Sequence, residues 1–155
     1  MPAMPDRGLE PAAARPPCRI ALGFDFGRRR IGVAVGEAIT GSARPLRVLP
    51  VRQQHPDWNT IGHLIAEWRP DLLVIGVPRH ADDTASSITA AALRFSRQLH
   101  ERFRLPIATI DERLSSWEAE QRHFTATVGR RRSSDTATDA GAAAVILETW
   151  FNQQR

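Results

Sequence analysis

The chain has 155 residues, of which 42% are hydrophobic and 25% charged, a composition typical of one globular domain and not of a disordered chain. No run of residues approaches the roughly 18 apolar positions needed to span a bilayer, so we expect no membrane partner. The net charge is +4, and all 21 basic residues are arginine. Arginine binds phosphate with two parallel hydrogen bonds, which suits nucleic acid, although a GC-rich genome also replaces lysine by arginine.

The first part of the chain differs in composition from the rest. Residues 1–17 are dominated by proline, alanine and arginine without periodicity, and they lack the continuous apolar stretch of a secretory signal. We therefore predict a disordered extension at 1–17 and a single folded domain at 18–155. The one cysteine, Cys18, cannot form an internal disulfide, which agrees with a cytoplasmic location.

Three strands are predicted first along the chain, at 19–25, 31–36 and 43–51. A tight turn containing Gly27 joins the first two, and short connections of this kind imply an antiparallel meander. The apolar spacing from Trp58 to Trp68 then predicts a helix, with Asp57 as its N-cap and Pro70 ending it.

The remaining pattern alternates strands and helices. A continuous apolar run at 71–78 is typical of a strand buried on both faces. The elements expected after it are a helix at 86–103, a strand at 106–110, a helix at 114–124, a polar basic loop at 125–135 and an alanine-rich helix at 136–151. This order predicts an α/β fold whose mixed five-stranded sheet combines an antiparallel three-stranded meander with two parallel strands and is flanked by helices.

Acidic residues follow two of the predicted core strands. Asp25 ends the first strand, and Asp111 and Glu112 end the last, where ligand sites gather in open α/β sheets. Asp139 lies early in the final helix among small residues, which would let that helix approach the sheet closely. Carboxylates without His or Cys suit Mg²⁺ or Mn²⁺, and two such ions form the usual site for phosphodiester hydrolysis.

Each of these acids also has a simpler interpretation. A single strand-end Asp25 often belongs to a turn. Glu112 and Arg113 could form a surface ion pair, and Asp139 could interact with its helix dipole. The metal-site hypothesis therefore rests on three acids at places that the topology brings together.

Arginines near these acids are candidates for binding substrate phosphates. Arg29 and Arg30 follow the Gly27 turn, and the alternative for them is a solvated turn. Arg113 either orients substrate or pairs with Glu112 or Glu118. A second basic concentration lies in the predicted loop before Asp139, at Arg130, Arg131 and Arg132.

Five blocks of residues, in order, resemble the YqgF (RuvX-like) family of pre-16S ribosomal RNA nucleases, which are related to Holliday-junction resolvases. The blocks lie at 24–36 (FDFGRRRIGVAVG), 40–46 (TGSARPL), 74–78 (VIGVP), 111–115 (DERLS), and 139 with 142–147. The resemblance implies an RNase H-like fold and a divalent-metal nuclease with Asp25, Glu112 and Asp139 as catalytic metal ligands. It also implies a role in maturing the 5′ end of small-subunit ribosomal RNA.

Two loops depart from the family pattern. After Val77-Pro78 the family usually has an Asn-containing loop that ends in glycine, whereas residues 79–84 here read RHADDT. The loop before Asp139 usually carries lysines and glycines, whereas residues 129–134 read GRRRSS. The first departure bears on substrate contact and leaves the three acids in place.

The sequence thus predicts a Mg²⁺- or Mn²⁺-dependent endonuclease acting on structured RNA, the pre-16S rRNA of the pre-ribosomal particle, as a monomer or weak homodimer. One alternative is a Holliday-junction resolvase acting on branched DNA. Another is a non-catalytic nucleic-acid-binding module, which should lack one of the three acids. Asp25-x-Gly27 also suggests the phosphate loop of an actin-like ATPase. That architecture needs two such domains around the nucleotide, and we predict only one, which counts against this alternative.

Overall fold

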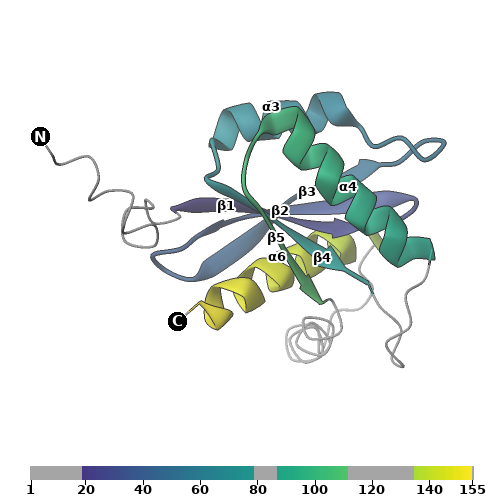
Figure 1. Ribbon diagram of the computed structural model, residues 1–155. Coiled ribbons are helices and arrows are strands. Elements are labelled where there is room, and N and C mark those ends of the chain that lie inside the picture. Colours follow the sequence, from purple (N-terminus) through teal and green to yellow (C-terminus); the bar gives the residue numbers. More distant parts are fainter. Residues whose placement is uncertain (1–18, 79–86, 112–134, 155) are drawn as a thin grey trace, which may run out of the picture.

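The computed structural model describes residues 19–78, 87–111 and 135–154, with residues 135–139 described by their backbone. These parts of the chain form five strands and three helices (Figure 1). Their bounds are β1 (Ile20–Phe26), β2 (Arg30–Glu37), β3 (Ser42–Pro50), α3 (Trp58–Trp68), β4 (Leu72–Val77), α4 (Ser87–Phe103), β5 (Ile107–Asp111) and α6 (Asp135–Gln153). The described elements therefore follow the predicted order, with ends displaced by one or two residues.

The strands form one mixed sheet in the order β3-β2-β1-β4-β5. β1 pairs antiparallel with β2, and β2 with β3, which confirms the predicted meander. β4 lies parallel to β1 and to β5, so the predicted pair of parallel strands is confirmed as well. The predicted helix at 114–124, the loop residues 79–84 and 125–134, and the extension at 1–17 lie outside the described residues. The final helix begins at Asp135, where the sequence pattern had placed the last loop residue.

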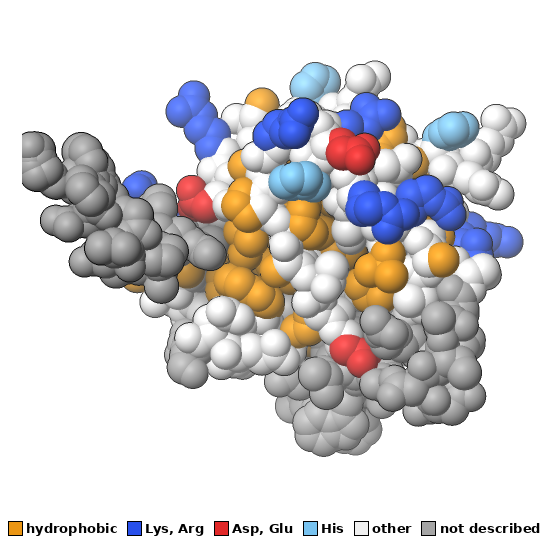
Figure 2. All heavy atoms as spheres, viewed as in Figure 1, with side chains coloured by type: hydrophobic (Ala, Val, Ile, Leu, Met, Phe, Trp, Pro, Cys, Tyr) orange, Lys and Arg blue, Asp and Glu red, His pale blue; other side chains and the backbone are white. Residues whose placement is uncertain are grey.

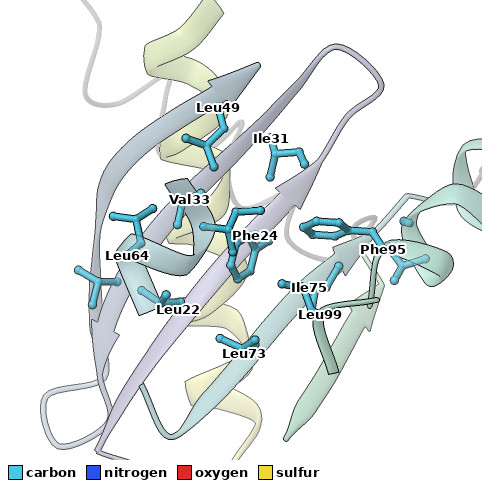
Figure 3. Packing of buried hydrophobic residues seen from close by; sticks show 14 residues of the cluster. Leu22, Phe24, Ile31, Val33, Leu49, Leu64, Leu73, Ile75, Phe95 and Leu99 are labelled. Carbon is cyan, nitrogen blue, oxygen red and sulfur yellow. The ribbon is translucent and has the colours of Figure 1, made fainter. Parts of the chain in front are cut away.

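Helices cover both faces of the sheet: α3 and α4 lie on one face and α6 on the other (Figure 1). The α3–α4 side holds the large side chains of the core, as Figure 3 shows. Phe95 of α4 lies at its centre, with its ring centroid 5.7 Å from that of Phe24, 5.2 Å from that of Phe26 and 5.6 Å from that of Trp58. This cluster anchors α4 to the sheet beside the end of β1.

Helix α3 begins and ends where its sequence predicts. The Asp57 carboxylate accepts hydrogen bonds from the Thr60 backbone N–H at 3.1 Å and the Thr60 hydroxyl at 2.7 Å, so Asp57 is the N-cap. At the other end Arg69 adopts a left-handed conformation with φ 49°, directly before Pro70. No helix in the described part of the chain is long and apolar enough to cross a membrane.

Small residues line the α6 face of the sheet. They include Ala21, Gly23, Ala34 and Gly36 on the two central strands. A Cβ added at Gly23 would lie 2.6 Å from Leu147 Cγ and 3.1 Å from the Ala143 carbonyl oxygen. The backbone of α6 therefore lies directly on β1, which confirms the expectation that small residues bring the final helix close to the sheet.

Candidate active site

Asp25 is the next-to-last residue of β1 and its side chain is half-buried. Its partners on the two neighbouring strands are glycines, Gly32 of β2 and Gly76 of β4. Paired residues project to the same face of a sheet, and a Cβ at Gly76 would press against Ile146 of α6. Asp25 therefore stands on the α6 face, between two positions that carry no side chain.

Helix α6 runs antiparallel to β1, so its first turns lie toward the strand's carboxyl end. A Cβ at Gly36, the partner of Ala21, would lie 2.8 Å from Phe151 Cε2, whereas Gly23 meets Leu147 and Ala143. Decreasing residue numbers in α6, from 151 to 143, therefore correspond to increasing residue numbers in β1, from 21 to 23. Figure 1 shows the same direction, with the carboxyl end of α6 on the side where β1 begins.

This arrangement fixes the level of the helix backbone at position 139. From Gly23 to Asp25 the strand rises about 6.6 Å, and from Ala143 back to Asp139 the helix spans about 6 Å. By these rises, position 139 falls near the level of Asp25 along the strand. The side chain of Asp139 lies outside the described side chains.

The third predicted ligand follows β5, which is separated from β1 by β4. Asp25, Gly76 and Ile110 form one row across β1, β4 and β5. β5 ends at the half-buried Asp111, and Glu112 is the next residue in the chain, outside the described part. Within the described residues no group of three His, Cys, Asp or Glu side chains gathers, so the three-carboxylate metal site stays a prediction.

The β1–β2 turn places arginines at the same end of the strands as Asp25. A Cβ at Gly27 would lie 2.6 Å from the Arg30 carbonyl oxygen, so this tight turn requires glycine. Arg28 and Arg29 are exposed and Arg30, the first residue of β2, is half-buried. Arg29 and Arg30 thus lie at the end of β1 as predicted, whereas Arg113, Arg130, Arg131 and Arg132 fall outside the described residues.

Sequence reasoning missed one contact at this edge. The Arg28 guanidinium donates a hydrogen bond to the Ser87 hydroxyl at the start of α4. The two residues are far apart in the chain, and no local pattern links them. This bond ties the turn beside Asp25 to the helix that follows the 79–86 segment.

A pocket of about 170 Å³ lies away from these residues, where β1 begins. Its walls include Ile20, Glu37, Ser42, Arg44 and Trp68. Because it lies at the end of β1 opposite to Asp25, it is not part of the candidate active site.

A family model described as RuvX, Holliday junction resolvase, matches residues 19–153. The chain belongs to the RuvX family. Its relatives include proteins named "Putative pre-16S rRNA nuclease" from Nitrosococcus oceani, 45% identical over 147 residues, and from Azotobacter vinelandii, 47% identical over 137 residues. The first alignment covers 94% of this chain and 93% of the relative, and the second covers 88% and 95%.

Solved structures place the RuvX-family fold among the resolvases. Thermus thermophilus RuvC in complex with a Holliday junction substrate superposes with a TM-score of 0.57 at 16% identity, covering 88% of this chain and 95% of that one. The yeast mitochondrial resolvase Ydc2 gives a TM-score of 0.56 at 11% identity, covering 99% and 87%. The mixed five-stranded sheet with its helices is therefore the RNase H-like resolvase fold that the sequence predicted.

Proposed function

We propose that this RuvX-family chain is a divalent-metal-dependent endonuclease that hydrolyses a phosphodiester bond of pre-16S rRNA and matures its 5′ end. The names of its relatives support the substrate. The observation that carries the proposal is the place of Asp25, at the carboxyl end of β1 between Gly32 and Gly76, with α6 bringing position 139 to its level.

The described part of this edge fits a hard cation. Asp25 offers carboxylate oxygens, which Mg²⁺ and Mn²⁺ prefer. We propose that Asp25, Glu112 and Asp139 hold the metal. When bound, it lowers the pKa of a water molecule and neutralises the charge of the scissile phosphate.

The chain's own arginines would position the substrate in this proposal. Arg29 and Arg30 stand at the β1–β2 turn beside Asp25 and would bind phosphates next to the scissile bond. Arg113, Arg130, Arg131 and Arg132 would add contacts from the segments around Glu112 and before Asp139. Arg28 is held by Ser87, so its part is to fix the turn on α4.

The test is cleavage of an RNA that carries the 5′ extension of 16S rRNA by the full chain, with Mg²⁺ or Mn²⁺ and with EDTA. Asp25→Asn should lower metal-dependent cleavage by at least about 100-fold, since even residues behind metal ligands cost 10–100-fold. The matched control is Asp71→Asn. The Asp71 carboxylate accepts from the Arg19 and Ile20 backbone N–H groups at 2.8 and 3.0 Å, at the other end of β1. Full metal-dependent activity of Asp25→Asn would refute the mechanism.

A second candidate function is resolution of branched DNA, favoured by the description of the family model. The same assay with a four-way DNA junction separates the two. A resolvase cuts symmetrically as a dimer, so preferential junction cleavage by a dimer in sedimentation would replace the RNA substrate in the proposal. Binding of either nucleic acid without cleavage at any metal concentration would favour the non-catalytic module.

A further inference from the structure

We infer that edge strand β3 and the residues after it carry a phosphate-binding row of three arginines, Arg44, Arg47 and Arg52. This row guides the RNA strand toward the carboxyl end of β1, where Asp25 lies. The inference rests on the proposed nuclease function and extends it to a surface beyond the arginines predicted from the sequence. All three side chains are exposed. β3 is an edge of the sheet, so no neighbouring strand in the described sheet covers its outer side.

An irregularity in β3 brings two of these arginines to one face. Arg44 and Arg47 are three residues apart, so regular alternation would place them on opposite faces. Arg44 instead pairs with Val35 and Arg47 with Val33, because the register shifts between Val33 and Ala34. Val33 and Val35 both belong to the core under α3 and α4. The extra residue in β3 therefore places Arg44 and Arg47 on the α3 side together.

The contacts of these arginines leave a net positive charge. The Arg44 guanidinium lies 5.2 Å from the centre of the Trp68 ring, which fixes its position while its N–H groups stay near solvent. Arg47 and Arg52 both help to lower the pKa of the Asp57 carboxyl, after the larger effect of its hydrogen bonds to Thr60. One carboxylate thus faces two guanidinium groups, and that carboxylate is already engaged as the N-cap of α3.

The row ends at the β1–β2 turn next to the candidate active site, whereas the Asp25 side chain projects from the opposite, α6 face of the sheet. The Val51 N–H donates to the Arg29 carbonyl oxygen at 2.8 Å, so Arg52 follows a residue that is bonded to the β1–β2 turn. Moving away from this turn and along β3, the arginines lie in the order Arg52, Arg47 and Arg44. At about 3.3 Å per residue the path from 52 to 44 covers roughly 25 Å, the length of several stacked nucleotides.

Basic side chains also lie elsewhere on this side of the molecule. In the view of Figure 2, arginines are spread over the upper part of the molecule, where Figure 1 places α3 and α4, and acidic side chains are fewer there. Arg94 and Arg97 on α4 and Arg104 directly after it are exposed, and these three form a natural comparison for the β3 row, called the α4 control below. Charged residues on an edge strand can also serve to prevent pairing with another chain, so the experiment must separate binding from that role.

The test is the salt dependence of binding to the 5′-extended RNA, measured in EDTA so that cleavage does not contribute. The variant Arg44→Gln/Arg47→Gln/Arg52→Gln should reduce the slope of log K against log salt by about 2 for single-stranded contacts or about 2.7 for duplex contacts. The α4 control, Arg94→Gln/Arg97→Gln/Arg104→Gln, removes the same charge from α4 and the residue after it. It should keep most of the slope of log K against log salt. If the triple variant does not fold, Arg47→Gln and Arg52→Gln singly should each lower the slope by about 0.7–0.9.

Two outcomes would overturn the inference. If the α4 control loses as much of the salt-dependence slope as the β3 variant, or more, the β3 row has no special role in RNA binding. An unchanged slope with new oligomers of the β3 variant in sedimentation would show that the arginines protect the edge instead. Because binding is measured without cleavage, either outcome leaves the Asp25→Asn result, and with it the proposed nuclease function, to be judged separately.

Discussion

The contact between α6 and β1 makes a sharp prediction for Gly23→Ala. The new methyl group would lie 2.6 Å from Leu147 Cγ, which rotation about χ2 does not move, and 3.1 Å from the Ala143 carbonyl oxygen, which is backbone. Overpacking of this kind costs about 1–3 kcal/mol. For a chain of this size each kcal/mol shifts the melting temperature by roughly 2–4 °C, so we expect Gly23→Ala to melt roughly 2–12 °C lower.

Two other glycines serve as matched controls in the same urea and thermal unfolding experiments. At Gly76 the new methyl would press on Ile146 Cδ1, the end of a side chain that can rotate about χ2, and would lie 3.0 Å from Cγ1. Its three nearest atoms include no backbone atom, so Gly76→Ala should cost less than Gly23→Ala. At Gly141, inside α6, nothing lies within 4 Å of the new methyl. Gly141→Ala should therefore stabilise the protein by about 0.5–1 kcal/mol, the usual gain of alanine over glycine in a helix.

A double-mutant cycle tests whether Leu147 causes the effect. Leu147→Ala removes the atoms that Gly23→Ala would strike, so the two changes together should cost less than their sum, with a coupling of about 0.5–3 kcal/mol. Cleavage should fall with Gly23→Ala as well, since α6 carries Asp139. Additive free energies, or a Gly23→Ala cost no larger than that of Gly76→Ala, would refute the close approach of the helix.

Three further substitutions test the fold. Asp57→Ala should cost about 1 kcal/mol at pH 7. The hydrogen bonds from Thr60 lower the pKa of Asp57 below 3.8, so its contribution is present above that pH and is lost as the pH falls through the lower, folded-state pKa. Urea midpoints of the wild type and the variant should converge as the pH is lowered through this range, and a constant gap would contradict this. Phe95→Ala should cost about 3–5 kcal/mol in urea unfolding, because three aromatic rings pack on Phe95. Glu148→Ala should cost about 1.5–3 kcal/mol, because its carboxylate accepts from the Ala43 N–H at 3.0 Å, whereas Glu148→Gln should lose less.

The part of the fold that the sequence predicted is the part set by local signals. Short turns allow only hairpins, so the meander of β1, β2 and β3 followed from the Gly27 turn and the apolar runs. The cap at Asp57 and the stop at Pro70 likewise predicted α3 within its own residues. For the site, local reasoning placed Asp25 at a strand end and expected a close final helix.

Long-range pairing was not predictable in the same way. Nothing near Asp25 in the chain indicates that Gly76 lies opposite it, because register between parallel strands is set by packing across the whole sheet. The register shift in β3 leaves no clear sign either, since residues 43–51 show no strict alternation. The Arg28–Ser87 bond has the same origin, in two segments that meet only after folding.

The two faces of the sheet differ in a way that stability alone does not explain. Alternation in β1 sends Phe24 toward α4 and Gly23 and Asp25 toward α6. Larger residues on the α6 face would bury more apolar surface, worth roughly 25 cal/mol per Å², but they would hold the helix away from the strands. Four helix residues span about 6 Å and two strand residues about 6.6 Å, so the contact of Ala143 with Gly23 brings position 139 near the level of Asp25. A slip of α6 by a single residue would move that position by about 1.5 Å along the strand, a displacement large enough to disturb a shared metal centre. We therefore attribute the small residues of this interface to the placement of the candidate carboxylates, at the expense of apolar burial.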